Sequence, residues 1–388
     1  MSFVRKHIKG DRALWAIIFI LAFASILSVY SSTGFLAERV RGGNTSYYLF
    51  KQFFSLGIGI VVMIVCSNMK ADLIVAASIL TLYISILLLL ITLFMGATLN
   101  TASRWLVVPV VGISFQPSEF AKISLIVYIA NVLARYQKED GPITKPFWNI
   151  IIHVAIVFSL IVTENLSTAL LIVAVSFAMM FVGRISMKYL LVTAAVAISF
   201  VGLVILLSSH LDFIPRAKTW SSRIEQFVNP EEANPNLKYQ SEQSKIAIAT
   251  GGLLGKGPGN SVQRNFLPHP YSDFIFAIIA EEYGLFGALI IIFCYMSILG
   301  RVGVIMFNSK RTFPAFMSLG LGVMLVSQAL LNMGVAVGLF PVTGQPLPLV
   351  SLGTSSILSS SIAFGFILSA SRINKDQKAL EKGETEIE

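Results

Sequence analysis

A series of long apolar runs constrains the fold of this chain more than any other feature of its sequence. A helix that crosses the hydrocarbon core of a bilayer needs roughly 20 predominantly apolar residues. Runs of about this length lie at 13–31, 49–68, 73–95, 116–134, 149–163, 166–183, 189–207, 274–299, 313–332 and 355–371. Charged residues make up 13% of the chain, against about a quarter in a soluble globular domain. The sequence therefore predicts an all-α, polytopic membrane protein with about ten transmembrane helices.

The distribution of Lys and Arg predicts the topology. The short runs at 149–163 and 166–183 are separated by Glu164 and Asn165, so they form either two spans or one fused span. Two spans give the usual excess of basic residues in cytoplasmic loops. The inner segments then hold Lys70, Arg135, Lys138, Lys145, Arg184, Lys188, Arg301, Lys310, Arg311 and Arg372, whereas the short outer loops hold Arg39, Arg41 and Arg104. We predict one transmembrane domain over 1–388 with both termini cytoplasmic, a large extracytoplasmic loop at 208–273 between the seventh and eighth spans, and a cytoplasmic tail at 373–388.

Charge, cysteine and histidine content argue against several classes of function. The net charge of +9 follows from basic cytoplasmic loops and does not indicate a nucleic-acid partner. Cys66 and Cys294 fall inside apolar runs, and the four histidines are scattered without the spacing of metal ligands. The glycine-rich stretch at 251–259 lacks the pattern of a nucleotide-binding P-loop. We predict no metal site and no required cofactor, and no motif supports a divalent cation.

Asp273 lies where the polar loop 208–273 meets the predicted eighth span. A carboxylate at such a boundary is close to lipid and still within reach of water, so it can exchange protons. The alternative is that Asp273 only caps the helix that follows, which is a common role for Asp. Asp273 is the first candidate for a catalytic base.

Two further acidic clusters are candidates for function. Glu119 lies in the first turn of the fourth span beside Ser118, and Lys122 follows at i+3 on the same face. The two side chains either take part in a site or only neutralise each other. Glu281 and Glu282 come two turns after Asp273, roughly 12 Å deeper on a straight helix. They could form an ion site of a transporter, or pair with a cation such as Lys122.

The loop at 208–273 is too long for a passive connector. Its residues 237–250 have a moderately amphipathic pattern that predicts an interfacial helix. Basic residues, among them Lys245, make the loop suitable for a diphosphate. Glycines at 251–259 could offer backbone N–H groups to a phosphate, or they could form a flexible connector.

Four segments together resemble the SEDS family (shape, elongation, division and sporulation), and its division branch more than its rod-elongation branch. They are NTASRWL at 100–106 with FQPSEFAK at 115–122, YQSEQSKIAIATGGLLGKGPGNSVQ at 239–263, FLPHPYSDFIFAIIAEEYG at 266–284, and NMGVAVGLFPVTGQPLPLVSLGTSS at 332–356. The similarity follows the family's order and spacing over nearly the whole chain.

The resemblance implies a ten-span peptidoglycan glycosyltransferase of the bacterial cytoplasmic membrane. It implies polymerisation of lipid II at the outer face, with a class B penicillin-binding protein and other divisome proteins as partners. The family's essential aspartate falls on Asp273. The motif residues of the fourth span fall on Glu119 and Lys122, and the motif Arg-Trp falls on Arg104 and Trp105. Further positions within these motifs that we expect to contact substrate are Lys245, Gln263 and Gln345, with Ser118, Glu164 and Glu281 in support.

Three segments depart from the family pattern. The family's QPDLGTA becomes TENLSTA at 163–169, which places Asn165 where the family has Asp, although Glu164 could substitute. PEAHTD becomes PHPYSD at 268–273, and SYGGSS becomes SLGTSS at 351–356. All three changes leave Asp273 in place.

Chemistry then assigns the roles. The attacking sugar hydroxyl needs a base, and charge develops on the departing diphosphate. One carboxylate, Asp273, and nearby cations such as Lys122 or Arg104 meet both needs. A single base fits direct displacement with inversion. The alternatives are a lipid II flippase, which would carry polar residues through the midplane, and a non-catalytic division scaffold, which would not need Asp273.

Overall fold

The structure is a computed structural model, and it describes residues 9–42, 44–95, 106–107, 114–137, 143–163, 165–206 and 235–381. Three of the predicted site residues, Arg104, Trp105 and Glu164, lie outside the described residues.

Apolar helices form nearly the whole of the described chain, and each predicted span is confirmed as a helix. The spans are α2 (Arg12–Ser32), α4 (Thr45–Asn68), α5 (Ala71–Met95), α6 (Pro117–Tyr136), α7 (Phe147–Val162), α8 (Leu166–Val182), α9 (Met187–Leu206), α12 (Ile275–Phe307), α13 (Thr312–Val337) and α14 (Thr354–Glu381). Seven of them are long and apolar enough to cross a membrane, and α7, α8 and the Met187–Ala197 part of α9 are shorter apolar helices. The polytopic all-α fold is therefore confirmed.

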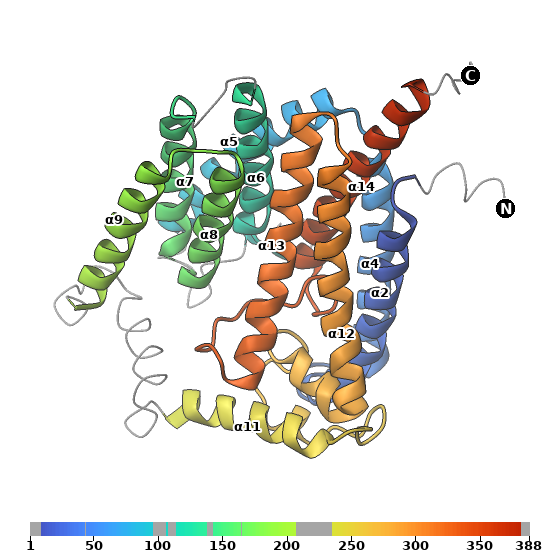
Figure 1. The fold of residues 1–388 in the computed structure, drawn as a ribbon. Coiled ribbons are helices and arrows are strands. Elements are labelled where there is room, and N and C mark those ends of the chain that lie inside the picture. The colour runs from blue at the N-terminus through green and yellow to red at the C-terminus, as the bar shows by residue number, and fades with distance from the viewer. Residues whose placement is uncertain are drawn as a thin grey trace.

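Shorter elements connect these spans. They are α3 (Gly34–Arg41), α11 (Pro235–Gly251), the 3₁₀-helix η1 (Gln263–Asn265), and the two-residue strands β1 (Leu106–Val107) and β2 (Ser114–Phe115), which pair antiparallel. Helix α11 confirms the helix predicted at 237–250. It lies across one end of the bundle, whereas α2 begins and α14 ends at the other end (Figure 1).

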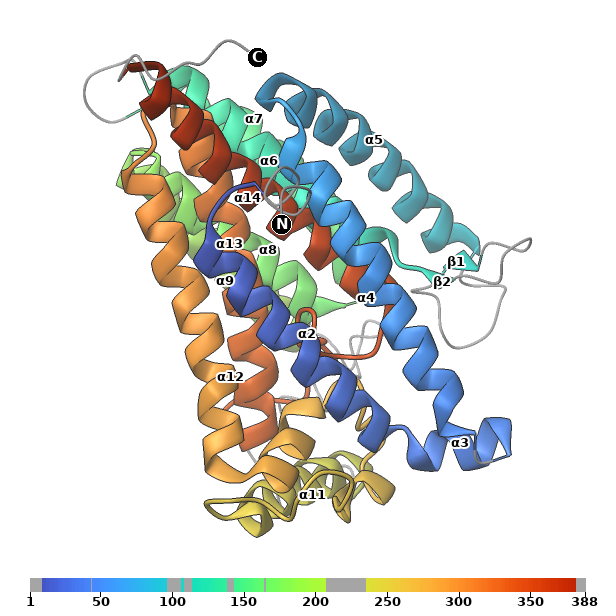
Figure 2. The ribbon, with the colours of Figure 1, turned by 90° about the vertical axis from the view of Figure 1, so that its right-hand side faces the viewer.

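Three helices form the centre of the bundle. About three quarters or more of the most apolar window of α6, α13 and α14 is buried, at 78%, 72% and 83%, against 28% for α5. Helix α14 packs against α4 and α13, and α13 also packs against α6 and α12. Figure 2 shows α14 enclosed between α4, α6 and α13. The buried polar side chains on these central helices therefore face protein, and each needs a hydrogen-bond partner there.

Three helix boundaries bear on the sequence-based prediction. One separates two spans as predicted, and the other two differ from it. Asn165 separates α7 from α8, because its Oδ1 accepts a hydrogen bond from the Thr168 N–H and caps α8. Helix α14 continues to Glu381, so the predicted tail at 373–388 is helical over most of its length. Helix α12 breaks at Gly284, whose φ of 66° and ψ of −164° are non-helical. A Cβ there would lie 2.4 Å from the Gly255 nitrogen, so only glycine fits this break.

Candidate active site

The loop between α13 and α14, residues 338–353, joins several helices at one place. It accepts hydrogen bonds from α2 through Ser25 Oγ to the Val350 carbonyl (2.8 Å) and from α12 through Tyr295 OH to the Pro348 carbonyl (2.6 Å). From α13, Gln328 Nε2 donates to the Pro346 carbonyl (2.9 Å). In return, Gln345 Nε2 donates to Thr168 Oγ1 of α8 (2.6 Å). We call this segment the tethering loop, because hydrogen bonds tie its main chain to three helices and its Gln345 side chain to a fourth.

Asp273 lies next to the tethering loop and is partly exposed. Its main-chain N–H donates to the His269 carbonyl (3.2 Å), and its main-chain carbonyl accepts from Asn332 Nδ2 (2.9 Å). Its carboxylate accepts a hydrogen bond at Oδ1 from Ser272 Oγ (2.8 Å). Helix α12 begins two residues later, with Phe274 at the cap position and no side-chain capping bond. The alternative that Asp273 caps this helix is therefore wrong.

The segment that carries Asp273 is bonded directly to the tethering loop. Ser351 Oγ donates to the Ser272 carbonyl (2.6 Å), and the Leu352 N–H donates to the Tyr271 carbonyl (2.9 Å). Each of the two segments contains a non-glycine residue with positive φ, His269 at 54° and Leu349 at 62°. Such conformations cost of order 1–3 kcal/mol and persist where the surroundings impose them. The two segments thus form one tightly held unit around the Asp273 carboxylate.

Tyr271 lies in the electrostatic field of Asp273. Burial raises the pKa of the Tyr271 hydroxyl above its ordinary value of 10.0, and the neighbouring Tyr48 and the negative charge of Asp273 raise it further. Tyr271 therefore keeps its proton at neutral pH. Its oxygen lies 3.1 Å from His269 Nδ1, so Tyr271 and His269 bond to each other at the positions where the family has His and Glu.

The predicted pair of Glu119 and Lys122 forms deep inside the bundle. Lys122 Nζ lies 2.9 Å from Glu119 Oε1, and both residues are buried, at 1% and 4% exposure. Lys122 Nζ also donates to Gln328 Oε1 (2.7 Å), and Ser359 Oγ donates to Glu119 Oε2 (2.7 Å). The same Gln328 holds the Pro346 carbonyl, so the ion pair is connected to the tethering loop. Breaking such a pair on one side typically costs about 3–5 kcal/mol, because the remaining charge is buried without a partner.

The match to a family of known proteins agrees with this arrangement. A family model described as "Cell cycle protein", named for FtsW, RodA and SpoVE, matches residues 11–376. The chain belongs to this family. These are the SEDS proteins that the sequence motifs resemble, and the match includes every candidate site residue described above.

Individual SEDS relatives are similar over almost their whole length. The probable peptidoglycan glycosyltransferase FtsW of Trichlorobacter lovleyi is 32% identical over 365 residues, which cover 93% of each chain. The stage V sporulation protein E of Bacillus subtilis is 30% identical over 377 residues, covering 95% of this chain and 99% of that protein.

Two solved structures share the fold. A chain from a structure titled "Structural coordination of polymerization and crosslinking by a peptidoglycan synthase complex" has a TM-score of 0.68 and 24% identity, with 94% of this chain and 98% of that chain covered. The rod shape determining protein RodA of Thermus thermophilus has a TM-score of 0.65 and 22% identity, with 94% and 97% covered.

Glu281 and Glu282 have a different environment from the one that the sequence predicted. Glu281 is fully buried, and its carboxylate accepts hydrogen bonds from Lys256 Nζ (2.6 Å), Ser261 Oγ (2.5 Å) and the main-chain N–H groups of Val262 (3.1 Å) and Gln263 (3.2 Å). Glu282 accepts from Ser31 Oγ and from the Ser261 N–H. Both glutamates come before the break of α12 at Gly284, so they do not lie on the straight part of the span that follows it. Their carboxylates instead bind residues 256–263. The alternative that these acids pair with a cation is confirmed for Glu281, but the cation is Lys256 and not Lys122.

Of the remaining predicted residues, two lie in or against the tethering loop and two lie beside the buried glutamates. Gln345 lies inside the loop and is buried, and Ser118 is buried beside Glu119. Lys245 is exposed on α11, where its side chain packs against Gly338 at the start of the loop. Gln263 begins η1, and its main-chain N–H donates to the Glu281 carboxylate.

Four residues of the site were not predicted individually from the sequence: Gln328, Asn332, Thr168 and Ser359. Gln328 and Asn332 are both 1% exposed, and they lie four residues apart within an apolar span. Residues at i and i+4 share a helix face. A pair of amides on one face of a membrane helix was therefore a signal that could have identified them, because polar side chains inside a membrane are costly and need partners.

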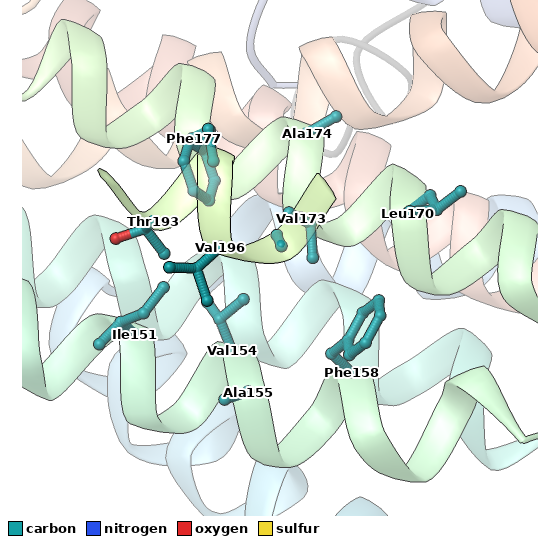
Figure 3. Close-up of a pocket in the computed structure, with 12 residues that line it drawn as sticks. Ile151, Val154, Ala155, Phe158, Leu170, Val173, Ala174, Phe177, Thr193 and Val196 are labelled. Atoms are coloured by element: carbon teal, nitrogen blue, oxygen red, sulfur yellow. The ribbon is translucent and has the colours of Figure 1, made fainter. Parts of the chain in front are cut away.

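Two further observations concern metal binding and a hollow away from this site. Among the described residues, no three His, Cys, Asp or Glu side chains come together as metal ligands. An apolar hollow of about 720 Å³ lies between α7, α8 and α9, lined by residues such as Val154, Phe158, Leu170, Phe177 and Val196 (Figure 3). Its lining contains no titratable group. The hollow therefore suits hydrocarbon. It has no side chain that could transfer a proton, as Asp273 could.

Proposed function

We propose that this SEDS chain is a peptidoglycan glycosyltransferase that polymerises lipid II into glycan strands for septal wall synthesis. The observation that carries the proposal is the environment of Asp273. Its carboxylate is partly exposed and accepts one hydrogen bond, from Ser272, within a unit that is fixed to the tethering loop. A base must be reachable by substrate and held in place, and Asp273 meets both conditions. The names of the FtsW relatives support the same reaction.

The proposed reaction is a direct displacement. Asp273 accepts the proton of a sugar hydroxyl on the acceptor strand while its oxygen attacks the anomeric carbon of the donor. The bond from that carbon to the lipid diphosphate breaks, and the electron pair leaves with the diphosphate. Because the proposed step uses Asp273 as a base and involves no covalent intermediate, the configuration at the anomeric carbon inverts.

Cations are needed to stabilise the departing diphosphate. Lys122 is 1% exposed and already paired with Glu119, so we assign it to positioning the tethering loop through Gln328. The exposed Lys245 on α11 is the better candidate for the diphosphate, together with Arg104 from the sequence motif. Carbonyl, hydroxyl and amide groups of the loop, including Gln345, would contact the sugars.

The proposed orientation places α11 and Asp273 outside the cytoplasmic membrane and both termini inside. The excess of Lys and Arg in the loops at the other end supports it. A reporter fused near Asn236 should be active only when exported, and a fusion at the C-terminus only when cytoplasmic; the reverse pattern would contradict the orientation. We further propose a class B penicillin-binding protein and other divisome proteins as partners.

Polymerisation of lipid II by the purified protein with its class B partner tests the function directly. We expect glycan strands that resolve as a ladder on a gel and that are absent without the SEDS chain. A flippase would instead move lipid II across vesicle membranes without forming strands. A scaffold would do neither. The absence of strands under conditions where the partner is active would therefore overturn the proposal.

A further inference from the structure

A single side-chain amide joins Asp273 to the tethering loop. Asn332 Nδ2 donates one hydrogen bond to the Asp273 carbonyl (2.9 Å) and another to the Gln345 carbonyl (2.7 Å). The two N–H bonds of an amide are fixed in one plane. The amide therefore sets the separation between the two main-chain segments, and Asn332 itself is 1% exposed on the central helix α13.

The position of Asp273 depends on such external support. Because α12 begins at Ile275, Asp273 lies before the helix and its main chain is not fixed by helical hydrogen bonds. Its N–H bonds within the same turn, to His269. Among the described residues, Asn332 makes the long-range hydrogen bond to Asp273 itself, whereas Ser351 and Leu352 bond to its preceding neighbours, Ser272 and Tyr271.

We propose that Asn332 is a positioning residue for catalysis, which holds the Asp273 carboxylate at its working distance from substrate bound against the tethering loop. This inference rests on the proposed function of Asp273 as the base. A misplacement of about 1 Å can cost a catalytic group about a hundredfold in rate. Asn332 acts on where the base lies and does not contact substrate, so it contributes to the rate at saturation more than to substrate binding.

The experiment compares Asn332→Leu with Tyr295→Phe in the full-length chain with its partner. Leu has the same branching at Cγ and the same number of side-chain heavy atoms as Asn, and it removes both N–H donors. Tyr295→Phe is a matched control, because it also removes one buried hydrogen bond to a tethering-loop carbonyl, that of Pro348, and leaves Asp273 untouched. The measurements are the initial rate of strand formation against lipid II concentration, and hydrogen–deuterium exchange of residues 266–274.

For Asn332→Leu we expect kcat to fall about ten- to a hundredfold with KM changed less than about twofold, and faster exchange at 266–274. For Tyr295→Phe we expect a smaller fall in kcat and no change in that exchange. Equal losses in the two variants, or a normal kcat in Asn332→Leu, would overturn the inference. If Asn332→Leu does not fold, Asn332→Gln replaces it; it keeps an amide that is displaced by one carbon–carbon bond, and full kcat in that variant would equally contradict the positioning role.

These outcomes are separate from the fate of the proposed function. A wild-type chain that forms no strands with an active partner contradicts the glycosyltransferase proposal. A wild-type chain that forms strands, together with a normal Asn332→Leu variant, contradicts only the role of Asn332.

Discussion

Asp273 and Glu281 belong to one short stretch of chain, but the structure surrounds their carboxylates in opposite ways. Glu281 is fully buried, and its carboxylate accepts four hydrogen bonds, from Lys256, Ser261, Val262 and Gln263. Asp273 is partly exposed, and its carboxylate accepts one hydrogen bond, from the adjacent Ser272. A carboxylate whose lone pairs are used by donors stabilises structure, whereas one with free lone pairs can take a proton.

The main chain around Asp273, unlike its carboxylate, is held by several hydrogen bonds. The backbone around Asp273 is held by Asn332, Ser351 and Leu352, and residues on both sides of the contact adopt positive φ. Thus Asp273 combines a fixed backbone with an available side chain, as a catalytic group requires. In our proposal, the number of donors around each carboxylate, and not its place in the sequence pattern, distinguishes the structural acid Glu281 from the proposed base Asp273.

The largest effect on stability is expected at another buried carboxylate, Glu119. Lys122→Ala removes its ionic partner and leaves the charge buried, so the free energy of unfolding should fall by about 3–5 kcal/mol. Lys122→Met combined with Glu119→Gln removes both charges and should recover most of that loss. Thermal unfolding in detergent measures both variants. A Lys122→Ala variant of normal stability would show that the pair contributes little to the bundle.

Glu281→Gln sharpens the comparison in the segment itself. Gln keeps one acceptor oxygen but turns the other position into a donor that faces Ser261 and the Gln263 N–H. We expect a loss of about 1–3 kcal/mol in stability from the unsatisfied groups. The rate per folded molecule should fall far less than for a change at Asp273. A loss of activity at full stability would make Glu281 a catalytic residue and break the comparison.

The smallest effect is expected at Asn165, which occupies the position of the family's aspartate. Its side chain caps α8 through the Thr168 N–H, and loss of a cap typically costs about 1 kcal/mol. Asn165→Ala should therefore lower the unfolding temperature slightly. Asn165→Asp should be close to neutral, because Asp and Asn cap helices about equally well. Strand formation that requires Asp at this position would indicate a catalytic role instead.

The helices of this fold could be predicted from the sequence because the bilayer imposes a minimum length on apolar runs. The break in α12 at Gly284 could not be predicted, because glycine is common in membrane helices and does not by itself indicate a break. Its conformation depends on the contact with Gly255, which comes from a different part of the chain. The straight-helix assumption therefore misplaced Glu281 and Glu282.

The candidate site was predictable in part for a related reason. Asp273, Glu119 and Lys122 stand out in sequence as charges at or inside apolar runs. The contacts that organise them are made by main-chain carbonyls of the tethering loop, and a sequence does not show where a carbonyl points. Gln328 and Asn332 were visible as amides on one helix face, but their partners, the Pro346 and Asp273 carbonyls, were not.

The rate of strand formation by Asp273→Asn tests the central claim most directly. Asn keeps the size of Asp and can still accept the hydrogen bond from Ser272, so expression, unfolding temperature and partner binding should match the wild type. It cannot accept a proton from the sugar hydroxyl, and the loss of general base catalysis should lower the rate about 10²–10⁴-fold. With Glu281→Gln measured beside it as the control, we predict that strands nearly vanish for Asp273→Asn alone. A normal rate for Asp273→Asn would contradict the assignment of Asp273 as the base.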